Sequence, residues 1–244
     1  MSYPLRKNKT LLLCRSLIFW MYSLFSICLF SVIVVCSCML PLRIRHAEVR
    51  AFLRSHLFML NYICQINYRV EGLSHIPIDR GGVVLCKHQS TWETFFLPLL
   101  FHDPAIILKR ELCWIPFFGW GLALIDPISI NRSHKTSAME QIITKGRKCL
   151  QNGRWVIIFP EGTRMPVGKE GHYKSGGARL ATATGYPVIP VAHNAGRYWP
   201  RRKFIKQPGT IQVVIGPLID TQNRTTESVL KEAKTWIENT MKLL

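Results

Sequence analysis

The chain has 244 residues, with 32 Lys or Arg against 14 Asp or Glu and a formal net charge of +18. Hydrophobic residues make up 48 %, which excludes a disordered basic tail, and 16 Gly with 14 Pro are too few for a collagen-like or low-complexity chain. The charge indicates an anionic partner: phosphate, nucleic acid or membrane headgroups. The eight Cys contain no CxxC pair, which excludes a disulfide scaffold and favours reduced thiols in a reducing compartment.

The N-terminal part predicts a membrane anchor, residues 16–66, behind a basic segment, residues 1–15. Ser16 to Leu42 carries no charge, and as a helix it can cross a hydrocarbon core of about 30 Å. It is too long for a signal peptide and has no small-x-small cleavage site. A second apolar piece, Ala51 to Ile66, contains an Arg and a His and predicts an interfacial helix or the return arm of a re-entrant hairpin. Positive charge on both flanks leaves spanning and re-entrant anchors open.

Residues 67–244 alternate between short apolar runs and polar, helix-like segments, so we expect one α/β domain. Buried strands are predicted over Gly82–Cys86, Ala105–Leu108, Trp155–Phe159, Pro187–Val191 and Ile211–Ile215. Helices are predicted over Thr136–Leu150, Gly176–Thr184 and Thr225–Leu244. This alternation indicates a sheet with helices on its faces.

The first candidate site follows the predicted strand Gly82–Cys86, where open α/β sheets place ligands. His88 and Glu93 are five residues apart, so on one continuous helix their side chains would diverge by about 140°. They meet only if His88 lies in the turn and Glu93 in the first helical turn, with Ser90 or Thr91 as N-cap. A carboxylate that accepts from one imidazole nitrogen leaves the other nitrogen as a base. Alone, a surface histidine beside a helix-start glutamate gives the same pattern.

The second candidate site is the turn Phe159–Arg164 after the next predicted strand. Gly162 allows close backbone approach to an anion, Arg164 offers a bidentate fork for phosphate, and Lys174 follows closely. Alone, this is also the composition of an ordinary turn. The glycine spacing fits neither a Walker loop nor a dinucleotide fingerprint, which excludes both nucleotide sites.

A third stretch combines cations with apolar and aromatic residues. Lys109 precedes a segment that contains Pro116, Phe117, Phe118 and Gly119. Such a composition suits a groove with an apolar wall and a charged mouth, although a core loop with solvated ends is the alternative. Further along, His193 is interpreted as a structural or rim histidine rather than a second base. No metal-ligand spacing is present in the sequence.

In this order, the blocks resemble the 1-acylglycerol-3-phosphate acyltransferase family of glycerolipid acyltransferases. That family has a His-x4-Asp block, a block with a basic residue and Pro-x-x-Gly, a Pro-Glu-Gly-Thr-Arg block and a Val-Ile-Pro-type strand. Here they are matched by His88–Glu93, Lys109–Gly119, Phe159–Arg164 and Val188–Val191. Glu93 departs from the usual Asp by one methylene. The resemblance implies a mixed sheet flanked by helices, with an N-terminal hydrophobic helix or helical hairpin as membrane anchor.

The resemblance also implies the reaction: an acyl chain passes from acyl-carrier protein or coenzyme A to the 2-hydroxyl of lysophosphatidate, giving phosphatidate for phospholipid synthesis. His88 is then the general base and Glu93 stabilises its imidazolium. The implied phosphate site consists of Lys109, Glu161, Gly162, Thr163, Arg164 and Lys174, with Glu161 orienting Arg164 or the glycerol. The implied acyl-groove residues are Pro116, Phe117, Phe118 and Gly119. No cofactor, metal or acyl-enzyme is expected, and Cys86 is set aside as a nucleophile.

The expected partners are the lysolipid, the acyl thioester and an anionic membrane surface, at the inner (cell) membrane with the catalytic domain on the cytoplasmic side. Four alternatives remain open. The acceptor could be another lysophospholipid, a lyso-ornithine lipid or glycerol 3-phosphate, or water could replace it in a thioester hydrolase. A membrane-tethered nucleic-acid-binding module would suit the charge, but the cations are scattered and no nucleic-acid motif is present. A catalytically inactive scaffold is the last alternative.

Overall fold

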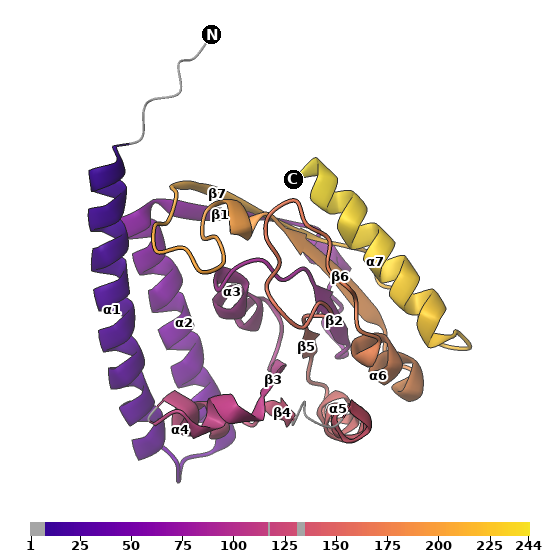
Figure 1. The fold of residues 1–244 in the computed structure, drawn as a ribbon. Coiled ribbons are helices and arrows are strands. Elements are labelled where there is room, and N and C mark those ends of the chain that lie inside the picture. Colours follow the sequence, from indigo (N-terminus) through magenta and orange to yellow (C-terminus); the bar gives the residue numbers. More distant parts are fainter. Residues whose placement is uncertain (1–7, 117, 131–134) are drawn as a thin grey trace.

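In the computed structural model, which describes residues 8–116, 118–130 and 135–244, seven strands form one mixed sheet (Figure 1). The strands are β1 (Ile66–Glu71), β2 (Val83–Cys86), β3 (Ala105–Lys109), β4 (Ile128–Ile130), β5 (Val156–Ile158), β6 (Val188–His193) and β7 (Gly209–Ile215). Their order is β1-β7-β6-β2-β5-β3-β4, and every neighbouring pair is parallel except β6 and β7. The expectation of a mixed α/β sheet is confirmed.

Helices cover both faces of this sheet because alternate strand residues point to opposite sides. The α-helices are α1 (Lys9–Cys36), α2 (Leu42–Cys64), α3 (Trp92–Leu100), α4 (Phe118–Ala123), α5 (Lys135–Gln151), α6 (Gly176–Thr184) and α7 (Thr226–Leu243). Val84 and Cys86 of β2 pack into a cluster with residues of α1, α2 and α3. Val83 and Leu85 of the same strand pack with residues of α5, α6 and α7. Figure 1 shows these two groups of helices on opposite sides of the strands.

The five strands and three helices predicted for residues 67–244 are confirmed, with bounds that shift by up to two residues. Two further strands, β1 and β4, were not predicted. β1 lies at one edge of the sheet, and most of its residues are exposed, so it lacks the apolar run that marks a buried strand. β4 is only three residues long at the opposite edge.

The N-terminal region forms a helical hairpin, α1 and α2, side by side in Figure 1. α1 begins at Lys9 rather than Ser16, because the Asn8 side chain accepts from the N–H groups of Thr10 and Leu11 and caps the helix. In the described residues, α1 is the one helix long and apolar enough to span a membrane. The hairpin also contributes to the core: Phe19 and Leu60 belong to the same buried cluster as residues of β2 and β5.

The parallel strands bring the candidate residues to one edge of the sheet. β6, β2, β5 and β3 are consecutive neighbours in the same direction, so their carboxyl ends meet. His193 and Lys109 are the last residues of β6 and β3, and His88 and Arg164 lie in the loops after β2 and β5. The topology therefore gathers blocks that are up to about 100 residues apart in the chain.

Candidate active site

His88 and Glu93 meet across the junction of the β2 loop and α3. Glu93 lies in the first turn of α3, after Thr91 at the N-cap position. Its Oε1 lies 2.8 Å from Nδ1 of His88 and also accepts from the backbone N–H groups of Gln89 (2.9 Å) and Ser90 (2.8 Å). The expectation that the two side chains meet only in this loop–helix arrangement is confirmed.

These contacts fix the protonation pattern of the pair. Burial raises the pKa of Glu93, but the imidazoles of His193 and His88 and the Ser90 N–H lower it, and the net shift is downward. An ionised Glu93 is an acceptor only, so Nδ1 of His88 carries a hydrogen. The other ring nitrogen, Nε2, is left as the basic one. Phe159 stacks on the His88 ring with 4.1 Å between centroids and holds its orientation.

His193 lies behind Glu93 and is buried, which confirms its interpretation as a structural histidine. Its Nε2 donates to the carbonyl of Lys87 (2.8 Å), and its Nδ1 accepts from the N–H of Ala195 (3.2 Å). Burial lowers the pKa of His193, so the ring is neutral at pH 7. Its Nε2 lies 3.8 Å from Oε2 of Glu93, beyond hydrogen-bond distance.

Glu161 occupies a different position from the one expected. Its side chain is fully buried; Oε2 accepts from the His88 N–H (2.9 Å), and Oε1 accepts from Lys87 Nζ (2.7 Å) and the Gly171 N–H (3.2 Å). Burial raises the pKa of Glu161, and the hydrogen bonds from Lys87 and the His88 N–H offset part of this rise. Glu161 therefore holds the backbone of the loop 87–91 between β2 and α3, and among the described residues it has no hydrogen bond or ion pair with Arg164.

The cations of the predicted phosphate site surround the turn after β5. Arg164 is half-buried and lines a pocket together with His88, and its Nε is buried without a hydrogen-bond partner. Gly162 has φ +67°, and a Cβ there would lie 2.9 Å from Nζ of Lys174, so this ammonium lies over the turn. Lys109 is exposed and lines the same pocket as Arg164.

Backbone hydrogen bonds fix the conformation of this turn. The Gly162 N–H donates to the Phe159 carbonyl (2.9 Å) and closes the turn, so this N–H is not directed at an anion. Thr163 is exposed, at the surface of the turn. The Met165 N–H donates to the His88 carbonyl (2.7 Å), which joins the turn to the loop between β2 and α3.

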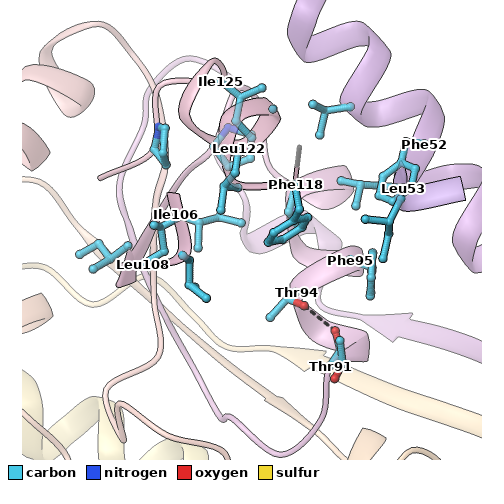
Figure 2. Close-up of a pocket in the computed structure, with 18 of the residues that line it drawn as sticks. Phe52, Leu53, Thr91, Thr94, Phe95, Ile106, Leu108, Phe118, Leu122 and Ile125 are labelled. Carbon is cyan, nitrogen blue, oxygen red and sulfur yellow. Dashed lines mark hydrogen bonds between the residues drawn. The ribbon is translucent and has the colours of Figure 1, made fainter. Parts of the chain in front are cut away.

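An apolar pocket of about 600 Å³ opens beside His88 and Arg164. Figure 2 shows Phe118 near its centre, between Phe52 and Leu53 of α2 and Ile106 and Leu108 of β3. The helical hairpin lines the pocket with Ile27, Phe30, Ser31, Val34, His46, Val49, Arg50, Phe52 and Leu53. A pocket of this size and lining suits a hydrocarbon chain whose polar end lies at the catalytic residues.

Comparison with known proteins identifies the family. The family model described as Acyltransferase matches residues 67–194. A 1-acyl-sn-glycerol-3-phosphate acyltransferase of Pseudomonas aeruginosa is 47 % identical over 206 residues, which cover 83 % of this chain and 80 % of that protein. The chain belongs to the 1-acyl-sn-glycerol-3-phosphate acyltransferase family. It is therefore an enzyme, an O-acyltransferase.

More distant relatives agree with this family. The mouse protein 1-acyl-sn-glycerol-3-phosphate acyltransferase alpha is 29 % identical over 188 residues, covering 76 % of this chain and 66 % of that protein. The crystal structure of the 1-acyl-sn-glycerophosphate (LPA) acyltransferase PlsC from Thermotoga maritima has a TM-score of 0.78 and 25 % identity, and the match covers 94 % of each chain. The fold of the acyltransferase is thus that of a solved enzyme.

The predicted acyl-groove residues of the acyltransferase are not all at the pocket. Phe118 lines it, while Phe117 lies outside the described residues. Gly119 is buried elsewhere, since a Cβ there would lie 2.6 Å from the Cys113 carbonyl, and Pro116 is exposed. Among the described residues, neither Pro116 nor Gly119 lines the pocket.

Several contacts around the candidate site of the acyltransferase were not predicted from the sequence. Lys87 is 1 % exposed and donates to Glu161 (2.7 Å) and Glu238 (2.8 Å), and the Tyr173 hydroxyl also donates to Glu238 (2.8 Å). A lysine flanked by a buried strand and a histidine was the available signal. The pocket walls in α1 and α2 were interpreted only as anchor, because apolar residues that face lipid or a ligand have the same composition.

Proposed function

We propose that this acyltransferase moves an acyl chain from a thioester to the 2-hydroxyl of lysophosphatidate, giving phosphatidate. The observation that carries the proposal is that His88 and Arg164 line a pocket whose other residues are mostly apolar. A base, a cation for phosphate and a groove for a hydrocarbon chain are the three features that such an acceptor needs. The relatives, which are 1-acyl-sn-glycerol-3-phosphate acyltransferases by name, support the same acceptor.

The chemistry follows from the protonation of the His88–Glu93 pair. Nε2 of His88 takes the proton of the acceptor hydroxyl as its oxygen attacks the thioester carbonyl, and Glu93 stabilises the imidazolium. The new C–O bond forms, the C–S bond breaks, and the proton passes from the imidazolium to the departing thiolate. The thioester is already activated, so the reaction needs no acyl-enzyme. Cys86, the nearest thiol, is fully buried, and burial raises its pKa well above the usual range.

The phosphate of the acceptor binds to Arg164, with Lys109 and Lys174 as further cations around the turn. Arg164 supplies a planar fork for two phosphate oxygens, whereas the lysines act as point charges. Gly162 allows Lys174 to approach the turn closely. Glu161 acts indirectly, through the His88 backbone and Lys87.

The donor is an acyl-carrier protein or coenzyme A thioester, and the enzyme acts at the cytoplasmic face of the cell membrane. Both donors are anionic, which fits a net charge of +18. α1 exposes large apolar side chains along its length, including Leu17, Trp20, Leu24 and Phe25, and provides the membrane anchor. The hydrocarbon pocket is lined by the same hairpin, so an acceptor can enter it from the bilayer.

Purified enzyme in detergent tests the proposal. Thioester consumption is followed with and without lysophosphatidate, beside His88→Ala. We expect acceptor-dependent turnover that falls by about 10²–10⁴-fold in the variant. Equal consumption with and without acceptor would instead identify a thioester hydrolase. Turnover with lyso-ornithine lipid or lysophosphatidylethanolamine but not with lysophosphatidate would keep the transferase and replace the acceptor.

A further inference from the structure

Arg201 contacts the phosphate-binding turn from a separate segment of the chain. It follows the 3-10 helix Ala195–Arg197 after β6, and its Nη1 donates to the backbone carbonyl of Arg164 at 2.6 Å. The Arg201 side chain is half-buried. Its guanidinium is close enough to Arg164 to lower the pKa of that residue. Arg201 therefore meets Arg164 through the backbone of the turn, and Arg164 lines the pocket that also contains His88.

No carboxylate neutralises this pair. All 14 Asp and Glu residues lie in the described parts of the chain, and none of them forms an ion pair with Arg164 or Arg201 there. Burial lowers the pKa of Arg164; the charge of Glu93 raises it, and Arg201 lowers it further. The Arg164 guanidinium nonetheless stays protonated at neutral pH. Two adjacent half-buried cations repel each other unless an anion lies between them.

We propose that Arg164 and Arg201 form a guanidinium clamp that selects an acceptor with a dianionic phosphomonoester over one with a monoanionic phosphodiester. The proposal rests on the proposed function, because it assigns the headgroup of the same acceptor. A phosphomonoester carries about −1.5 to −2 charges at pH 7 and has three terminal oxygens for two forks. A diester offers one charge and two such oxygens, so Arg164 alone satisfies it.

The segment around Arg201 is fixed on both sides, as a selective clamp requires. On one side, the Trp199 carbonyl accepts from the hydroxyl of Ser90, in the loop between β2 and α3 (2.7 Å). On the other, Nζ of Lys206 lies over the rings of Trp20 (4.1 Å), Trp199 (4.8 Å) and Phe19 (5.0 Å), which joins the segment to α1. The segment also contains Arg197, Arg202 and Lys203, which are exposed, so Arg201 is the cation of this segment held at the turn.

The test compares Arg201→Gln and Arg201→Lys with Lys203→Gln, an exposed cation of the same segment. Each enzyme is assayed with lysophosphatidate, a monoester, and with lysophosphatidylglycerol, a diester of the same acyl chain. We expect Arg201→Gln to lower kcat/KM for lysophosphatidate about 10- to 100-fold, as for the loss of a charge-assisted hydrogen bond, and for the diester less than about 3-fold. Arg201→Lys keeps the charge but loses the fork, so its kcat/KM for lysophosphatidate should lie between those of wild type and Arg201→Gln. Lys203→Gln should leave kcat/KM for both acceptors unchanged.

A second readout separates the clamp from a structural role of Arg201. The wild-type preference for the monoester should rise with pH through its second ionisation near pH 6, and this rise should flatten in Arg201→Gln. Equal losses on both acceptors, with the pH dependence intact, would show that Arg201 only holds the Arg164 backbone and would overturn the clamp. Unchanged kinetics on both would overturn it as well.

Binding without turnover keeps the inference testable if the proposed function fails. Glycerol 3-phosphate and glycerophosphoglycerol, a monoester and a diester, are titrated into wild type and Arg201→Gln by calorimetry. A wild-type preference for the monoester that the variant loses supports the clamp even where lysophosphatidate is not acylated. Equal affinity of the wild type for both probes would overturn it.

Discussion

Nζ of Lys87 lies 2.8 Å from Oε1 of Glu238, so the residue before His88 is bonded to the C-terminal helix α7. The same ammonium bonds Glu161, whose other oxygen accepts from the His88 N–H. One buried cation therefore joins β2, the turn after β5 and the last helix of the chain. The position of the loop between β2 and α3 therefore depends on a contact between Lys87 and Glu238, which are 151 positions apart.

Lys87→Met should destabilise the enzyme, because it leaves the buried carboxylate of Glu161 and the half-buried carboxylate of Glu238 without their cation. We expect a loss of about 3–5 kcal/mol in the free energy of unfolding, the range found when one partner of a buried ion pair is removed. The measurement is denaturant unfolding beside Lys234→Met, which breaks the exposed Lys234–Glu170 pair and should cost no more than about 1 kcal/mol. Equal effects of the two variants would contradict this role for Lys87.

Glu93→Gln should reduce kcat by about 10²–10⁴-fold, because the amide neither stabilises an imidazolium nor enforces the Nδ1–H tautomer of His88. Glu93→Asp keeps the charge but shortens the reach to His88, Gln89 and Ser90, and we expect a smaller loss of about 10-fold. Initial rates at saturating acceptor measure both, and circular dichroism checks that the variants are folded. A Glu93→Gln enzyme with the wild-type rate would show that Glu93 does not assist His88 as the base.

His193 should make stability depend on pH in a window just below 6.5. Its pKa in the folded enzyme is lowered from the ordinary 6.5, mainly by burial. Below pH 6.5 the unfolded chain thus binds a proton that the folded enzyme does not, so this contribution to stability is full above that pH and is lost as the pH falls. Urea unfolding between about pH 7.5 and 5.5 should show a weaker pH dependence in His193→Gln than in wild type. The same slope in both proteins would count against the buried neutral histidine.

Leu122→Trp should shorten the hydrocarbon chain that the enzyme accepts, because Leu122 lines the apolar pocket. Each methylene that no longer fits loses about 0.8 kcal/mol of burial, or about 4-fold in kcat/KM. Acyl length is varied separately in the donor and the acceptor, which also identifies the chain that occupies the pocket. Leu124→Trp, two residues along and outside the pocket lining, is the matched control. Loss of activity that is independent of chain length in Leu122→Trp would contradict this assignment.

The sequence by itself determined the elements and the chemistry that depend on local pattern. Short apolar runs predicted five strands, and the interior parallel strands β2, β5 and β6 are buried on both faces. The five-residue spacing of His88 and Glu93 allowed contact only across a loop–helix junction, because residues five apart on one helix point in different directions. The order of the blocks carried the family resemblance, and an uncharged N-terminal run indicated a membrane helix.

The tertiary structure alone decided which distant residues share the site. Strand order and loop packing bring Glu161, Glu238 and Arg201 to the loops after β2 and β5, and no local spacing in the sequence records that neighbourhood. Hydrophobic composition likewise does not distinguish a helix face in lipid from one that lines a pocket, so the part played by α1 and α2 in that pocket appeared only when they packed beside α3 and α4. The physical reason is that periodicity and turn chemistry act over a few residues, whereas the catalytic edge is assembled from four strands whose adjacency depends on the whole fold.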